Sequence, residues 1–456
     1  MCRLAPVVLG VLVVAGMSQA ASRNIVLMIG DDHGMQVGCY GDKVIKTPAM
    51  DRLASQGTRF ANAFAAVSSC SPSRSVILSG MFTHSNGMYG LAHATHNFHS
   101  FQDVRSLPRQ LKQSGYRTAI IGKYHVQPEE TYPFTDVLPC PGGPRNVAAM
   151  AEEARKFMEA KSDSPFFLLV GYTDPHRDAK GFANKPKYDG IETITYKPQD
   201  IVVPPWLSDH REVREELAEY YQSISRLDQG VGLMLKAIAD TGHESDTLAI
   251  YVSDNGPPWP GAKTTLYDPG IHLPLIIRSP QQKKAGVVNE AMVSFVDLAP
   301  TILEWAGVEK PDKMFGRSLL PILEETRPEG WDTVYGSHTF HEVTMYYPVR
   351  MIRTRQYKYL LNLAHRLEFP FASDLWGSDT WQGVLKRGDK QYGQRTVDAY
   401  INRPREELYD LQADPHETRN LAGDPNHAKL VADLRARLLE WQEKTNDPWL
   451  IKYEHE

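Results

Sequence analysis

Two pairs of oxygen-bearing side chains stand out, because each pair directly follows a short apolar run. These are Asp31 with Asp32, and Asp254 with Asn255. Carboxylate and amide oxygens are hard ligands that suit Ca²⁺ or Mg²⁺ better than Zn²⁺. Either pair alone is typical of a turn or a helix cap. Two such pairs, each closing a buried strand, predict one divalent metal site.

Basic side chains elsewhere could bind an anion or move protons. The candidates are Arg74, Lys123, His125, His176 and Lys263. An arginine offers a planar fork of donors and a lysine a point charge, whereas histidine and lysine can handle protons. Alone, each is more often a surface charge or an ordinary hydrogen-bonded residue. A helix that begins near Ser71–Pro72–Ser73 would also direct backbone N–H groups at an anion beside residue 70.

The elements that must position these residues are short runs rich in β-branched and apolar residues. The clearest strand candidates are 24–29, 117–121, 166–172 and 247–253. They alternate with helical stretches, which favours an α/β fold with a large, mostly parallel sheet flanked by helices. Polar residues follow each run, beginning at Asp31, Gly122, Asp174 and Asp254. Ligands bind outside the carboxyl ends of parallel strands, so we expect all four segments to meet at one edge of the sheet.

Three helices are predicted from periodicity: 108–114 with Ser106 as its cap, 211–240 as one long helix or two joined near Gly230, and 296–306. From about residue 321 the pattern changes to short runs between turns. The runs 333–337, 348–354, 358–363 and 407–410 predict a small antiparallel sheet, followed by a terminal helix at 427–444. We therefore predict a catalytic domain at 22–325 and a C-terminal α+β subdomain at 326–456.

The composition is that of a globular protein, with 42% hydrophobic and 23% charged residues and a formal net charge of −5. This charge gives no general case for binding nucleic acid. Residues 1–21 resemble a cleaved signal peptide, with Arg3 before an apolar run that is too short to span a bilayer. We therefore predict a secreted or periplasmic protein without a membrane anchor. Of the remaining cysteines, Cys39 and Cys140 could pair or stay as free thiols.

The run Cys70-Ser71-Pro72-Ser73-Arg74 has the pattern Cys-x-Pro-x-Arg, the signal for oxidation of a cysteine to Cα-formylglycine. Together with Gly122-Lys123-Tyr124-His125, His176 and the two acidic pairs, it resembles the formylglycine-dependent type I sulfatases of the alkaline phosphatase superfamily. The resemblance implies an alkaline phosphatase-like fold and hydrolysis of a sulfate ester or sulfamate. It also implies a divalent cation, with Ca²⁺ favoured and Mg²⁺ as the alternative, held by Asp31, Asp32, residue 70, Asp254 and Asn255.

The same resemblance implies a role for each remaining residue. Residue 70, as the hydrated aldehyde, would attack sulfur, while Arg74 and Lys123 hold the sulfuryl oxygens. His176 and Lys263 would serve the leaving group or the sulfate. His125 would take the proton that lets sulfate leave and the aldehyde return.

The substrate is less well determined than the reaction. Longer stretches, such as His84–Leu91, are most similar to the heparan sulfamidases, which favours N-sulfoglucosamine. Two departures from the sulfamidase pattern are expected near the rim of the substrate pocket. Position 263 is Lys where that pattern usually has Arg, and the segment 181–205 has little similarity to it. The alternative is an O-sulfatase for an algal polysaccharide such as ulvan or carrageenan. A phosphodiesterase of the superfamily and a non-catalytic glycan binder are the other classes considered.

Candidate sugar contacts are His338, His341 and Glu342, and each could equally be a packed or surface residue. The expected partners are a sulfated saccharide and, during maturation, a formylglycine-generating enzyme. A homodimer is an open alternative, because Trp376, Trp381 and Tyr392 could line either a rim or a dimer contact.

Overall fold

The computed structural model describes residues 23–451, and the predicted signal peptide lies outside these residues. An eight-stranded sheet forms the centre, with the strand order β4-β3-β5-β1-β6-β7-β2-β8. Its strands are β1 (Asn24–Gly30), β2 (Thr58–Phe64), β3 (Arg117–Gly122), β4 (Asp136–Leu138), β5 (Phe166–Gly171), β6 (Thr247–Ser253), β7 (Leu275–Arg278) and β8 (Val287–Ser294). All neighbours pair in parallel except β7, which runs antiparallel to β6 and β2. The prediction of a large, mostly parallel sheet is confirmed.

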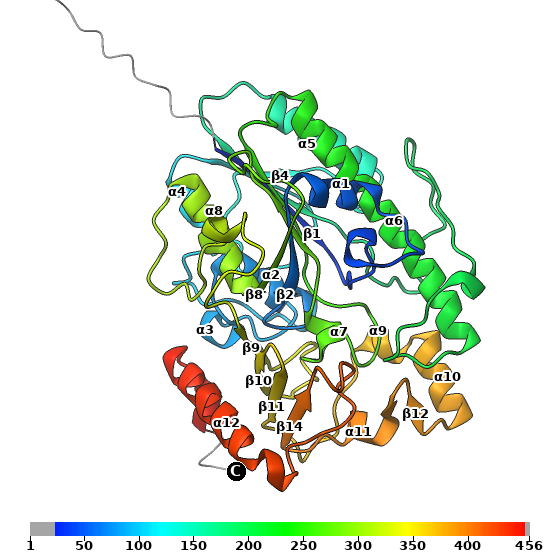
Figure 1. Cartoon of the computed structure of the whole chain (residues 1–456). Helices are drawn as coiled ribbons and strands as arrows, with labels where there is room; N and C mark the ends of the chain where they lie inside the picture. Colours follow the sequence, from blue (N-terminus) through cyan, green and yellow to red (C-terminus); the bar gives the residue numbers. More distant parts are fainter. Residues whose placement is uncertain (1–22, 452–456) are drawn as a thin grey trace, which may run out of the picture.

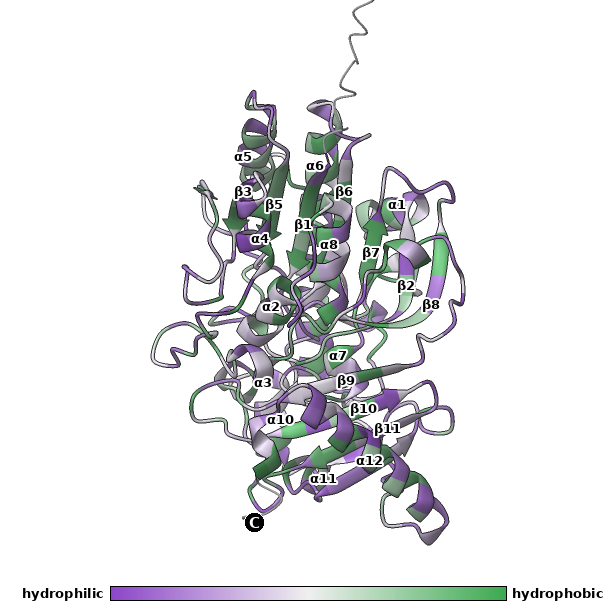
Figure 2. Ribbon diagram, turned by 90° about the vertical axis from the view of Figure 1, so that its left-hand side faces the viewer, coloured by the Kyte–Doolittle hydropathy of each residue, from purple (hydrophilic) through white to green (hydrophobic). Residues whose placement is uncertain are grey.

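Helices cover both faces of this sheet (Figure 1). One face carries α1 (Pro48–Gln56), α5 (Val147–Glu159) and α6 (Arg211–Asp240), and the other carries α2 (Cys70–Ser79), α4 (Leu107–Gln113) and α8 (Leu298–Ala306). Two short helices, α3 (Thr83–Asn86) and α7 (Asp268–Ile271), lie beyond the carboxyl ends of the strands. The strands at the centre are buried along their whole length, and β1 and β5 are mostly hydrophobic (Figure 2), as expected for strands covered on both faces.

The long helix α6 is continuous, which decides between the two predicted arrangements. Gly230 lies inside it, and a Cβ there would meet Val147 at 2.8 Å and Tyr172 at 3.0 Å. The glycine therefore permits close approach of α5 and the end of β5, rather than breaking the helix. Ser106 caps α4 as predicted, and its hydroxyl accepts a bond from the Arg109 amide.

A second, four-stranded antiparallel sheet packs below the first (Figure 1), again as predicted. It has the order β14-β11-β10-β9, from β9 (Thr333–His338), β10 (Val349–Thr354), β11 (Tyr357–Asn362) and β14 (Glu406–Asp410). Around it lie α9 (Ser373–Trp376), α10 (Asp379–Arg387), α11 (Val397–Ile401), the hairpin of β12 (Gln391–Tyr392) and β13 (Arg395–Thr396), and α12 (Ala428–Lys444). The predicted division at 325/326 falls between β8 and β9 and stays a prediction.

Two aromatic assignments are corrected by this region. Trp381 is fully buried and Tyr392 is 2% exposed, and both pack against Tyr400. Neither can line a rim or a dimer contact, because both belong to the core of this subdomain. Trp376 is 48% exposed.

Cys39 and Cys140 are both free thiols. Within residues 23–451, no helix has the length and apolar character that crossing a bilayer requires.

Candidate active site

Residue 70 occupies the first turn of α2, deep in the molecule. Cys70 is 1% exposed, and every residue of α2 is buried. Ser69 precedes the helix in an extended conformation, and the Ser73 amide donates to the Ser69 carbonyl at 2.8 Å. The positive end of a ten-residue helix therefore surrounds residue 70, which suits an anionic ligand.

The two oxygen-bearing pairs meet beside Cys70 because β1 and β6 are adjacent parallel strands. Gly30 pairs with Ser253, so both strands end at the same level. All four side chains that follow them are completely buried: Asp31, Asp32, Asp254 and Asn255. The Cys70 thiol lies 3.7 Å from Asp32 Oδ1. Ligand atoms of Asp31, Cys70 and Asp254 all lie within 4.8 Å of one another, as do those of Asp32, Cys70 and His176.

This donor set fits a divalent cation of the oxygen-preferring type. Asp31 Oδ1 and Asn255 Oδ1 are buried and have no hydrogen-bond partner in the part of the chain that the structure describes. Buried acceptors without partners are costly unless a ligand satisfies them. Asp32 has a left-handed backbone, with φ of 62°, and such a conformation in a non-glycine residue is common at functional sites.

Three cations balance the three carboxylates. Lys123 Nζ lies 2.5 Å from Asp31 Oδ2, Arg74 Nε lies 2.9 Å from Asp254 Oδ2, and Lys263 Nζ lies 2.9 Å from Asp32 Oδ2. Asp374, which also pairs with Lys263 at 2.8 Å, adds a fourth carboxylate to this cluster. A divalent cation would leave an excess of positive charge, and an anionic substrate would offset it.

The charges around Asp31 and Asp254 shift their pKa values in opposite directions. Burial raises the pKa of Asp31, but Lys123, His176 and Arg74 outweigh it and hold that pKa well below the usual value. Burial and the charge of Asp31 raise the pKa of Asp254 to about 8. A bound cation would favour the ionised form of both carboxylates.

Both predicted histidines reach the site. His125 follows β3 with a φ of 59°, and its Nε2 contacts His93 Nδ1. Burial, together with Lys123, lowers the pKa of His125 well below its usual value, so its ring is neutral. His176 follows β5 and is 27% exposed, with Nε2 lying 3.4 Å from Lys263 Nζ. Burial and Lys263 also lower the pKa of His176.

The three predicted sugar contacts lie at different depths. His341 is buried, and its Nδ1 lies 2.8 Å from the hydroxyl of Ser69. Glu342 is half-buried and accepts from the amide and the hydroxyl of Ser373. His338 is the last residue of β9 and only 1% exposed, so its side chain has almost no surface that a saccharide could contact. The sugar-contact role of all three stays a prediction.

The sequence reasoning missed two site residues. Asp374 Oδ2 accepts from Lys263 Nζ at 2.8 Å, and His93 contacts His125. Asp374 lies in the four-residue helix α9, in a stretch with no recognisable motif. The histidine-rich segment 93–99 was the available signal for His93.

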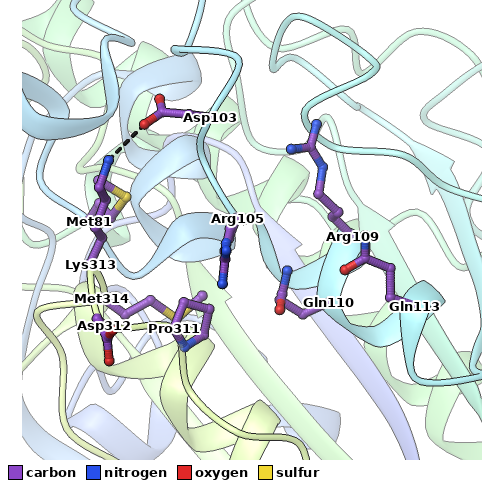
Figure 3. Close-up of a pocket in the computed structure, with 10 residues that line it drawn as sticks. All are labelled: Met81, Asp103, Arg105, Arg109, Gln110, Gln113, Pro311, Asp312, Lys313 and Met314. Atoms are coloured by element: carbon purple, nitrogen blue, oxygen red, sulfur yellow. Dashed lines mark hydrogen bonds and ion pairs between the residues drawn. The ribbon is translucent and has the colours of Figure 1, made fainter.

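A separate pocket lies away from the candidate site. A pocket of about 680 Å³ lies between α4 and the segment 311–314 (Figure 3). Lys313 pairs with Asp103 at its edge. None of the residues that line it belongs to the candidate site. Met81, in its wall, follows the carboxyl end of α2, whereas residue 70 begins that helix, so the two places are about 15 Å apart along the helix axis.

Comparison with known families assigns almost the whole chain. The sulfatase family model matches residues 23–308, and the model of the N-sulphoglucosamine sulphohydrolase C-terminal region matches residues 261–371. The second match spans the predicted boundary at 325/326. The human N-sulphoglucosamine sulphohydrolase is 42% identical, over 98% of this chain and 95% of the relative. An ulvan-active sulfatase of Formosa agariphila is 31% identical, over 93% of this chain and 80% of the relative.

Solved structures support the fold. An enzyme in complex with its substrate D-glucosamine-2-N,6-O-disulfate aligns with a TM-score of 0.68 and 23% identity, covering 94% of this chain and 99% of that chain. A phosphonate monoester hydrolase of Agrobacterium radiobacter aligns with a TM-score of 0.69 and 18% identity, covering 93% and 96%. The fold is therefore shared by different reactions, and the sequence matches decide between them. The chain belongs to the sulfatase family and is a hydrolase of sulfate esters or sulfamates.

Proposed function

We propose that this chain removes sulfate from a sulfated saccharide, that N-sulfoglucosamine is its favoured unit, and that Cys70 is converted to Cα-formylglycine. The observation that carries the substrate is the 42% identity to the human N-sulphoglucosamine sulphohydrolase across both sheets. The modification is supported by the Cys-x-Pro-x-Arg run, with its cysteine buried among carboxylates and cations.

The thiol of Cys70 is poorly suited to be the nucleophile itself. Burial raises its pKa well above the usual value, even though Lys123 and Lys263 lower it. A hydrated aldehyde at this position would supply a hydroxyl nucleophile and a second hydroxyl that allows sulfate to be expelled. The divalent cation, for which we favour Ca²⁺ over Mg²⁺, would be held by Asp31, Asp32, residue 70, Asp254 and Asn255 and would supply Lewis-acid stabilisation.

The chain's own cations would bind the sulfuryl group. Arg74 Nη2 is buried without a hydrogen-bond partner, and its Nη1 donates to the Lys123 carbonyl at 3.0 Å. This bond fixes the guanidinium plane, so Nη2 is free to donate to a sulfuryl oxygen. Lys123 is the more exposed of the two, at 16%, and can offset charge on a second oxygen. Both interactions strengthen as charge develops in the transition state.

Two histidines divide the proton transfers. His125 is neutral, and its Nδ1 is buried without a hydrogen-bond partner, so that nitrogen is available to accept the proton from residue 70. His176 and Lys263 lie together beside Asp32, and His176 is close to Cys70. We assign them to the leaving group, which must gain a proton as the S–N or S–O bond breaks.

The deciding experiment is sulfate release from N-sulfoglucosamine, measured beside O-sulfated monosaccharides and ulvan oligosaccharides. The protein should be co-expressed with a formylglycine-generating enzyme, and residue 70 checked by mass spectrometry. We expect release from the sulfamate and loss of activity on chelation. No release from any substrate, with formylglycine verified, would refute the proposal.

An O-sulfatase for an algal polysaccharide is the second candidate, because an ulvan-active relative covers most of the chain. Position 263 and the segment 181–205 also depart from the sulfamidase pattern. Release only from O-sulfated fragments would keep the site chemistry and replace the substrate. We further propose that the protein is exported through its N-terminal leader.

A further inference from the structure

The side chain of Lys263 is bound by Asp374, a residue from the C-terminal region around the second sheet. Its side chain is 1% exposed, and its Nζ has three polar neighbours: Asp32 Oδ2 at 2.9 Å, Asp374 Oδ2 at 2.8 Å and His176 Nε2 at 3.4 Å. An ammonium group has three donors. Each of the three N–H donors of Lys263 therefore has a partner. These partners hold the ammonium group between the carboxylates that would bind the cation and His176.

Only one of these neighbours can be dedicated to Lys263. Asp32 belongs to the carboxylate cluster that fits the divalent cation, and His176 is assigned to the leaving group. Asp374 has no other ionic partner among residues 23–451, and its remaining oxygen accepts from the Leu375 amide at 2.9 Å. That bond to its own helix turn fixes the carboxylate and leaves Oδ2 facing Lys263.

The short helix α9, which carries Asp374, is itself hydrogen-bonded to Glu342. Glu342 Oε1 accepts from the Ser373 amide at 2.8 Å and from the Ser373 hydroxyl at 2.6 Å. The neighbouring His341 lies 2.8 Å from the hydroxyl of Ser69, directly before residue 70. The segment 341–342 therefore connects the residue before the nucleophile with the helix that holds Lys263.

We propose that Asp374 is a positioning residue for Lys263, and that Glu342 acts on α9 rather than on the sugar. This inference rests on the proposed role of Lys263 at the leaving group. It also explains how a lysine can stand where the sulfamidase pattern has an arginine. A guanidinium is a rigid fork, whereas an ammonium on a flexible stem needs a second carboxylate to fix its direction.

The first test is kinetic. Asp374→Ala should lower kcat by roughly 10- to 100-fold, the loss expected when a hydrogen bond to a charged group is removed, with a smaller change in KM. Asp374→Asn keeps the size of the side chain and should lose less, and Asp374→Glu should restore part of the loss. Asp379→Asn is the matched control, because Asp379 is an exposed acidic residue at the start of α10 and has no ion pair within residues 23–451.

The second test is a double-mutant cycle. In a Lys263→Met background, Asp374→Ala should have almost no further effect, because residues that act through one contact are not additive. Glu342→Ala combined with Asp374→Ala should likewise be no worse than Asp374→Ala alone. A direct sugar contact of Glu342 would instead give additive losses and a raised KM, and would overturn that part of the proposal.

A crystal structure of Asp374→Ala supplies a readout that does not depend on turnover. We expect Lys263 Nζ to move by more than about 0.5 Å, the tolerance of a working site. An unmoved Lys263, or a kcat within twofold of the wild type, would refute the positioning role. If the saccharide proves wrong, an aryl sulfate can replace it in the cycle, so failure of the substrate assignment is distinguishable from failure of this inference.

Discussion

The buried ion pair between Arg177 and Glu216 should control both stability and the placement of His176. Arg177 Nη1 and Nη2 donate to the two carboxylate oxygens of Glu216, at 2.5 and 3.0 Å. Both residues are only 6% exposed. Glu216 also accepts from the Thr380 hydroxyl at 2.5 Å, so one carboxylate joins α6, the segment after β5 and α10.

We expect Glu216→Ala to lower the free energy of unfolding by about 3–5 kcal/mol, the usual cost of removing one partner of a buried ion pair. The cost arises mainly because Arg177 stays charged and buried, with only the Pro258 carbonyl at 2.9 Å as a hydrogen-bond acceptor. Removing both charges, in Glu216→Leu with Arg177→Met, should cost less than Glu216→Ala alone. An apolar replacement leaves no unpaired charge.

Denaturant unfolding of the wild type, each single variant and the double variant would measure this order. Steady-state kinetics should show a lower kcat for Glu216→Ala, since the Arg177 carbonyl lies 2.5 Å from His176 Nδ1 and orients that ring. Thr380→Val is the matched control, because it removes one bond to Glu216 but leaves the ion pair. If Glu216→Ala were as stable as the wild type, or if the double variant were less stable than Glu216→Ala, the reasoning would be refuted.

Three further predictions concern the nucleophile, the cation and pH. Cys70→Ala should abolish sulfate release while the melting temperature stays within a few degrees of the wild type, because a small apolar residue can replace a buried thiol; a folded variant that keeps turnover would contradict the assigned nucleophile. Chelation should remove activity and lower thermal stability, and added Ca²⁺ should restore both, since saturation at 100 times Kd stabilises by about 2.7 kcal/mol; stability unaffected by chelation would argue against the cation site. Burial raises the pKa of Glu407, but Arg403 and Arg395 outweigh it and lower that pKa to about 2. Ionised Glu407 therefore stabilises the folded state above its ordinary pKa of 4.5, and this contribution is lost as the pH falls toward 2. Glu407→Gln should therefore cost about 3 kcal/mol at pH 7 and progressively less in acid, and a constant difference measured by unfolding across that range would contradict this.

The central sheet could be predicted because its strands are buried on both faces. β1, β3, β5 and β6 read as continuous apolar runs, and their shared carboxyl edge brings the acidic pairs together as expected. β2 was not predicted, since its burial alternates and it contains Arg59 and Asn62. β7 is only four residues long and antiparallel, so neither length nor pattern distinguished it from a loop.

The cation side of the site was predictable from motifs, but the rim was not. Asp31, Cys70 and Asp254 each lie in a short run with its own signature. Asp374 lies 111 residues from Lys263 in the sequence, and nothing local marks it as a partner. For His338 the sequence was misleading in the opposite direction. It was predicted as a sugar contact, but it lies at the end of β9 and is buried.

The two sheets contribute differently to the chemistry. The large sheet and the helices that cover it supply the carboxylates, residue 70 and the cations that would hold the sulfuryl group. Asp31, Lys123 and Asp254 follow strand ends, whereas residue 70 and Arg74 lie in α2. The smaller region supplies α9 and the segment 341–342, in which Asp374 bonds to Lys263 and His341 bonds to Ser69. A change of leaving group therefore needs changes only in these attached segments and in 177–205, because the sulfate site stays fixed. We therefore propose that the determinants of the sugar lie in these segments and not around residue 70.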